Sequence, residues 1–231
     1  KFPLVSDFMS ACGDIVSVIA LLCGAAAAFF IYRKESVPPS DKLFSNKLNI
    51  PAVVILGITG CLGIDILISI ISELTGLSAA EGAGEALTSG QIIILALKAV
   101  VLAPIAEEIT FRGLCFGRIM AMRSRERERE KEFGPSFFLA AVVSSLLFGI
   151  YHLDVLQGIY AFFCGIIMCF VYHKFQNLWA SGIFHAAANA LMLILSATGA
   201  LNGIPVWGFA LIMAGCFAVS AVILIKMVKS N

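Results

Sequence analysis

The sequence predicts an all-α, polytopic membrane helix bundle with about seven transmembrane helices. Of the 231 residues, 60% are apolar and only 13% are Asp, Glu, Lys or Arg, whereas about a quarter of a soluble domain is charged. The mean hydropathy of +0.96 agrees with this. No polar stretch is long enough to fold separately, so residues 1–231 are expected to form a single integral membrane domain.

The expected spans are apolar runs of about 20 residues, long enough to cross about 30 Å of hydrocarbon as helices. Five runs are uninterrupted: 14–32, 50–71, 155–173, 178–197 and 205–226. Segment 91–121 is long enough but contains charged residues, and segment 137–152 is short. No alternating strand pattern competes, and an open sheet cannot span lipid because its edges would leave backbone groups unpaired.

The distribution of basic residues predicts an orientation in a cell (plasma) membrane. Lys and Arg occur in connections 33–49 and 118–136 and in the tail after residue 225, whereas connections 73–90 and 198–204 have none. The positive-inside rule then places the N-terminus outside and the C-terminus in the cytoplasm. The net charge of +1 gives no indication of a nucleic-acid partner.

Segment 118–136 is expected to be a basic, charged cytoplasmic loop. Within it, Arg125–Glu132 alternates in sign, so that Glu126 with Arg129 and Glu128 with Lys131 are pairs at i,i+3 on a helix. We interpret this run as a solvated extension of the preceding helix. A docking surface for a partner is the alternative.

Ionisable residues inside a span are costly and usually functional. Segment 91–121 contains the densest group, Glu107, Glu108 and Arg112. Glu108 and Arg112 are four residues apart and can form an internal ion pair. Glu107 points elsewhere and has no such partner, which suits a general base. Pro104 lacks an N–H, so the carbonyl of Val100 is expected to be unpaired and the helix to kink there.

Two further spans carry polar residues at helical spacing. Phe148 and His152 are four residues apart, as are His185 and Asn189, so each pair shares one helix face. Three alanines between His185 and Asn189 would let a neighbouring helix or a substrate chain approach closely. A buried Glu–Arg network could serve packing alone, but polar residues on three separate spans indicate a site.

These three motifs, E-E-x-x-x-R, F-x-x-x-H and H-x-x-x-N in this order, resemble the CPBP family of intramembrane glutamic proteases. That family includes the type II CAAX prenyl endopeptidases and the Abi proteins linked to bacteriocin immunity. The resemblance covers about residues 91–197, which it identifies as a four-helix catalytic core. It implies an intramembrane endopeptidase acting on a membrane-inserted peptide or a lipidated protein.

The resemblance also implies roles for individual residues. Glu107 and His152 would activate a water molecule, while His185 and Asn189 would stabilise the oxyanion. Glu108, Arg112 and Phe148 would support them. No cofactor is implied.

Two alternatives remain open from the sequence. Two His and one Glu can form a catalytic zinc site, although the sequence lacks an H-E-x-x-H motif. A non-proteolytic scaffold that modulates a membrane sensor or a bacteriocin-immunity system would use the same fold without catalysis.

One geometric problem follows from the predicted topology. Residue His185 lies near the cytoplasmic start of its span and His152 near the far end of segment 137–152. Straight perpendicular helices would keep them apart. Tilted helices, a bend near Gly149 or a recessed 137–152 segment could bring them together.

Overall fold

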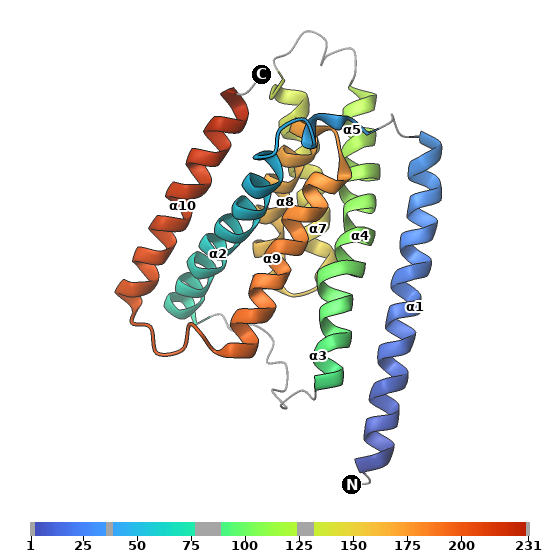
Figure 1. Ribbon diagram of the computed structural model, residues 1–231, viewed down its shortest axis with the longest axis vertical. Helices are drawn as coiled ribbons and strands as arrows, with labels where there is room; N and C mark the ends of the chain where they lie inside the picture. Colours follow the sequence, from blue (N-terminus) through green and yellow to red (C-terminus); the bar gives the residue numbers. More distant parts are fainter. Residues whose placement is uncertain (1–2, 36–38, 77–88, 124–131, 230–231) are drawn as a thin grey trace.

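The computed structural model describes residues 3–35, 39–76, 89–123 and 132–229 of the chain, and for residues 3–12, 14, 35 and 89–91 only the backbone. The described residues form a bundle of seven helical rods (Figure 1). The rods are α1 (Pro3–Glu35), α2 (Asn49–Thr75), the composite 89–122 helix, α7 (Pro135–Tyr151), α8 (Val155–Phe175), α9 (Leu178–Thr198) and α10 (Val206–Lys229). The predicted all-α fold is therefore confirmed, and the run Arg125–Lys131 lies outside the described residues.

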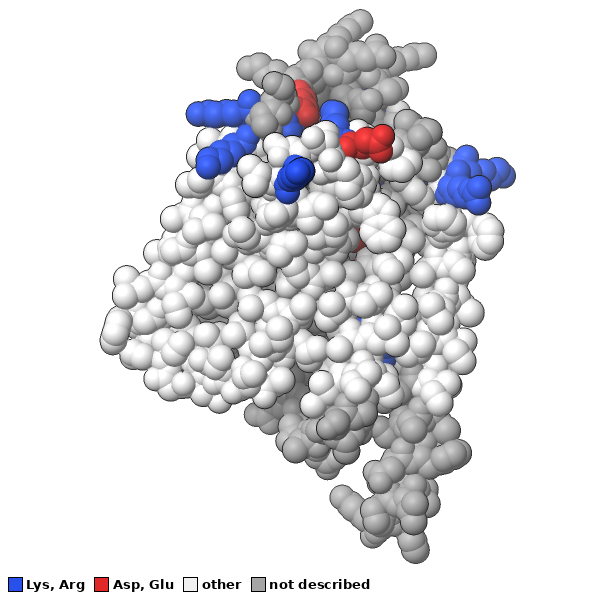
Figure 2. All heavy atoms as spheres, in the orientation of Figure 1, with Lys and Arg blue, Asp and Glu red and all other residues white. Residues whose placement is uncertain are grey.

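Five of these helices are long and apolar enough to cross a membrane: α1, α2, α8, α9 and α10. They are the five uninterrupted runs of the sequence. The other two rods are the short α7 and the charge-bearing 89–122 helix. In Figure 2, the visible Lys and Arg side chains gather at the end of the bundle where α1 and α10 finish, and the flanks are almost entirely uncharged. The chain is a polytopic helical membrane protein.

The 89–122 helix switches from α-helical to π-helical winding and back two times. It runs through α3 (Ser89–Ala96), the π-helical η2 (Leu97–Leu102), α4 (Ala103–Glu107), the π-helical η3 (Glu108–Phe116) and α5 (Gly117–Met122). Single π-helical turns inside α-helices occur frequently at functional sites. Here Glu107 is the last residue of the short α4 between the two π-helical stretches, and Glu108 is the first residue of the second stretch.

The packed centre of the bundle lies between α2, α8 and α9. Gly57 of α2 touches the backbone of Phe184 in α9, where a Cβ would lie 2.5 Å from the Phe184 carbonyl oxygen. Gly149 of α7 is equally close to Gly158 of α8, with 2.6 Å from the built Cβ to the Gly158 oxygen. Glycine permits such close approach of helices in a membrane, where dispersion contacts are a principal attraction.

The turn between α7 and α8 is short and locally stabilised. Leu153 adopts a left-handed conformation with φ of 57°. The Asp154 side chain then caps α8 by accepting a hydrogen bond of 2.8 Å from the backbone N–H of Gln157. This turn holds His152 at the carboxyl end of α7.

Candidate active site

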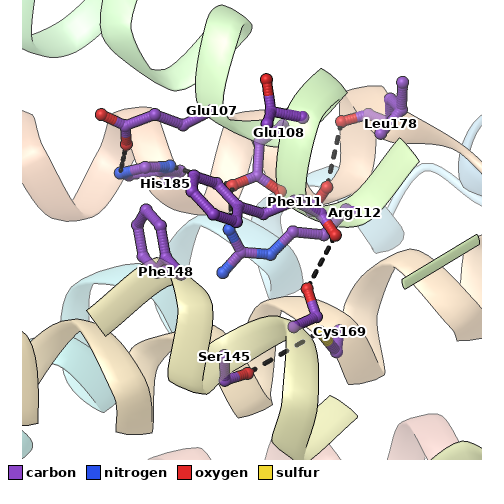
Figure 3. A network of polar contacts seen from close by, with 12 residues as sticks. Glu107, Glu108, Phe111, Arg112, Ser145, Phe148, Cys169, Leu178 and His185 are labelled. Atoms are coloured by element: carbon purple, nitrogen blue, oxygen red, sulfur yellow. Dashed lines mark hydrogen bonds and ion pairs between the residues drawn. The ribbon is translucent and has the colours of Figure 1, made fainter. Parts of the chain in front are cut away.

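Glu108 is the centre of a buried polar cluster. Its Oε1 atom lies 3.1 Å from Arg112 Nη1 and 3.0 Å from His185 Nδ1. Arg112 is fully buried, and its guanidinium carbon lies 4.4 Å from the centroid of the Phe148 ring. The i,i+4 pair expected from the sequence is therefore present, and it has a third member, His185 (Figure 3).

Glu107 faces the other side of the same imidazole ring. Its Oε2 atom lies 3.6 Å from His185 Nε2, as the dashed line in Figure 3 shows. Glu107 lines a cavity, whereas Glu108 is almost completely enclosed. The two adjacent glutamates thus have different surroundings, and Glu107 is the one that a substrate or a water molecule can reach.

The hydrogen bonds define which ring nitrogen of each histidine is protonated. His152 Nδ1 lies 2.8 Å from the carbonyl oxygen of Phe148, which can only accept, so Nδ1 donates and Nε2 is left for other partners. His185 Nδ1 donates likewise to Glu108. The backbone and Glu108 therefore orient both rings.

Asn189 has a structural partner that the sequence analysis did not anticipate. Its Nδ2 atom donates a 2.7 Å hydrogen bond to the carbonyl oxygen of Ala99. In the π-helical stretch the Ala103 N–H bonds to the Lys98 carbonyl, five residues back. By that register Ala99 would pair with Pro104, which has no N–H. The sequence analysis assumed α-helical winding and therefore expected the carbonyl opposite Pro104 to be that of Val100.

All four proposed catalytic residues line one cavity of about 390 Å³. The cavity lies between the 89–122 helix, α2, α7, α8 and α9, and its wall includes Glu107, His152, His185 and Asn189. The structure thus gathers residues from three separate helical rods.

His152 and His185 meet because α7 is short. It has 17 residues, about 26 Å of helix, against 21 residues in α9. The α7–α8 turn consequently lies inside the bundle relative to the lower ends of α3 and α9 (Figure 1). The Phe148 ring centroid lies 4.8 Å from that of His152 and 5.8 Å from that of His185. A recessed α7, one of the three arrangements left open above, is observed.

Several cavity residues were not singled out from the sequence. They are Cys61, Tyr151, Gln157, Tyr160 and Cys164. Tyr151 is adjacent to His152, and Gln157 and Tyr160 follow it by five and eight residues. Their nearness to His152 in the sequence was therefore a signal that could have identified them. Cys61 could not be found this way because it comes from α2, outside the motif-bearing helices.

Metal binding has a clear geometric requirement of at least three suitably placed ligands. Within the described residues, no group of three or more His, Cys, Asp or Glu side chains has an arrangement that could hold a metal ion. The polar groups around His185 instead bond to one another, and Arg112 lies among them. A positive guanidinium beside the glutamates does not suit a cation site.

The comparisons with known proteins agree with the motifs. Residues 89–191 match the model of the family described as "Type II CAAX prenyl endopeptidase Rce1-like". This segment of a polytopic membrane protein is therefore similar to that family, in agreement with the resemblance drawn from the sequence motifs.

One curated relative was found. It is the protein named "Putative membrane peptidase YdiL" from Bacillus subtilis (strain 168), which is 30% identical over 95 residues. The aligned region covers 41% of this chain and 34% of that protein, so the chain spans about a third of the relative's length. No solved structure matches the chain.

The hydrogen bond from Asn189 to Ala99 leads to a prediction about stability. Asn189→Ala should leave the Ala99 carbonyl without a donor and lower the free energy of unfolding by about 1–3 kcal/mol. Pro104→Ala supplies a new backbone N–H at the position that faces this carbonyl. In the Pro104→Ala variant, adding Asn189→Ala should lower the free energy of unfolding much less than it does in the wild type. Equal costs in both backgrounds, measured by a double-mutant cycle of unfolding in detergent, would contradict this explanation.

Proposed function

We propose that this protein is an intramembrane endopeptidase that hydrolyses a peptide bond of a membrane-associated or membrane-inserted peptide or protein. The observation that carries the proposal is the cavity lined by Glu107, His152, His185 and Asn189 among membrane-embedded helices. The match of residues 89–191 to an endopeptidase family supports it.

In this mechanism, Glu107 takes a proton from the attacking water and later returns it to the leaving amine. His152 orients the water through Nε2, the nitrogen that its bond to Phe148 leaves available. Both groups border the same cavity. The attack therefore takes place on the cavity side of Glu107, away from Arg112.

The developing negative charge on the carbonyl oxygen requires hydrogen-bond donors. Asn189 uses one Nδ2–H for Ala99, which orients the amide, and its second Nδ2–H can donate to the oxyanion. His185 would be the second donor, through Nε2, the nitrogen that lies on the Glu107 side of the ring at 3.6 Å from Glu107 Oε2. Glu108 and Arg112 position His185 rather than react.

The function is tested by comparing the peptides released from cells. Cells that contain the wild-type protein should release membrane-derived peptides that are missing from cells containing Glu107→Gln. Identical released peptides, at equal protein levels, would favour the scaffold function, in which the protein modulates a sensor or a bacteriocin-immunity system without cleaving it.

Metal independence gives a second test. Because the proposed water is activated by Glu107 and His152, hydrolysis should continue after treatment with a strong chelator. Loss of activity on chelation, and its recovery on adding zinc, would instead support a metal-activated water.

We also propose that the N-terminus lies outside the cell and the C-terminus in the cytoplasm. The helices α1, α8 and α10 run towards one end of the bundle, and each has basic residues in its last turn. The oppositely running α2 and α9 have none there. This asymmetry is the positive-inside pattern.

Labelling of single cysteines in a cysteine-free background tests this orientation. Cysteines placed between residues 76 and 88 should react with an impermeant reagent in intact cells. Those placed between residues 124 and 132 should react only after permeabilisation. Equal labelling of both segments in intact cells would exclude the seven-span topology.

A further inference from the structure

Two buried cysteines meet in the wall of the cavity. Cys61 of α2 and Cys164 of α8 are 103 residues apart in sequence, yet their sulfur atoms lie 3.2 Å apart. Both thiols are free and both residues are buried. Both also line the cavity that contains Glu107 and His152, so a small molecule in the cavity can reach them.

The surroundings of the pair are more specific than those of an isolated buried cysteine. Tyr160 is one helical turn before Cys164, and its buried hydroxyl lies beside both thiols. A disulfide has a sulfur–sulfur bond of about 2.05 Å. The two sulfurs therefore need to approach by about 1 Å, which small side-chain rotations in neighbouring packed helices can supply.

We infer that Cys61 and Cys164 form a redox site in the cavity wall, a dithiol that a small uncharged hydroperoxide converts to a disulfide. One thiol loses its proton and attacks a peroxide oxygen, the O–O bond breaks, and the leaving oxygen departs as water or an alcohol. The second sulfur then attacks the resulting sulfenic acid, the S–S bond forms, and a water molecule leaves. The two sulfur atoms lose two electrons and the peroxide gains them.

The position of the pair connects this oxidation to the proposed function, on which this part of the inference rests. One turn before Cys61, Gly57 packs against the backbone of Phe184, the residue before His185. Cys164 belongs to α8, which follows His152 directly in the chain. A disulfide would thus join the part of the wall behind His185 to the part that continues from His152. Since the link would restrict any movement of these two parts that admits a substrate chain to the cavity, the linked form should hydrolyse substrate more slowly.

The test treats the purified full-length protein in detergent with hydrogen peroxide, then blocks free thiols with a permeable maleimide and maps the peptides by mass spectrometry. A peptide linked through Cys61 and Cys164 should predominate and should disappear after reduction with dithiothreitol. The oxidised protein should melt at a temperature at least about 3 °C higher, because the link closes a long loop. If no such peptide forms, or if other cysteine pairs link equally often, the inference is wrong.

Matched variants complete the experiment. Cys169→Ala removes another buried thiol of α8, one that faces Ser145 rather than the cavity, so this variant should still form the link. The double variant Cys61→Ala, Cys164→Ala should have the same rate and melting temperature before and after peroxide. In the wild type, oxidation should lower hydrolysis at least about fivefold and reduction should restore it. If the disulfide forms without a change in the rate of hydrolysis, the inferred effect of oxidation on activity is wrong. If the protein forms the disulfide but hydrolyses no substrate even when reduced, the proposed function is wrong instead.

Discussion

Replacing Glu107 by Gln should abolish hydrolysis and leave the protein folded. General-base catalysis contributes about 100- to 10,000-fold to a rate, and glutamine keeps the volume of the side chain while removing the base. Glu107 makes only a 3.6 Å contact with His185 and lies partly open to the cavity. We therefore expect turnover of a cleaved peptide to fall by at least about 100-fold, with a melting temperature within about 2 °C of the wild type.

A matched control is Glu73→Gln, the same chemical change at an exposed position near the end of α2. It should alter neither rate nor stability. The assignment of the base would be falsified if folded Glu107→Gln protein kept full activity. If Glu107→Gln is silent in the cellular phenotype while changes at Glu108 abolish it, the scaffold function is favoured.

Replacing Arg112 by Ala should cause the largest loss of stability. Arg112 is fully buried, and its guanidinium lies between Glu108 and the Phe148 ring. Among the described residues, its Nε and Nη2 atoms have no hydrogen-bond acceptor. The ion pair with Glu108 is thus its main polar interaction. Removing one partner of a buried ion pair costs about 3–5 kcal/mol because the other charge is left uncompensated.

Unfolding in mixed micelles, followed by circular dichroism, would measure this loss. The free energy of unfolding of Arg112→Lys should lie between those of the wild type and Arg112→Ala. Lysine keeps the charge but cannot stack on Phe148 as a planar group. Arg33→Ala, at the exposed end of α1, should change the free energy of unfolding by no more than about 0.5 kcal/mol. Wild-type stability of Arg112→Ala would show that the pair contributes nothing to the fold.

The variant Glu108→Gln should have two effects, because the structure gives Glu108 two partners. The sequence indicates only the ion pair with Arg112, whereas the structure adds the hydrogen bond from His185 Nδ1. Glutamine keeps one acceptor oxygen but loses the negative charge, so the hydrogen bond from His185 weakens and the imidazole is held less firmly. Reduced activity is therefore expected even in the fraction of Glu108→Gln that folds.

The positions of the helices and the identity of the polar residues could be predicted from the sequence alone. Hydropathy over about 20 residues reports directly on membrane insertion, and the five uninterrupted runs became five helices. The i,i+4 spacing of Glu108 with Arg112 likewise specified a contact, because one turn of a helix brings such residues together. Both patterns depend only on neighbouring residues in the chain.

The contacts between helices were decided by the tertiary structure. The meeting of His152 with His185 depends on the recessed α7, and the bond from Asn189 to Ala99 depends on π-helical winding before Pro104. The contact of Cys61 with Cys164 joins residues from separate rods. Such contacts depend on where small residues let two helices approach and on how far each helix extends. In a uniformly apolar bundle, neither of these two properties leaves a periodic pattern in the sequence.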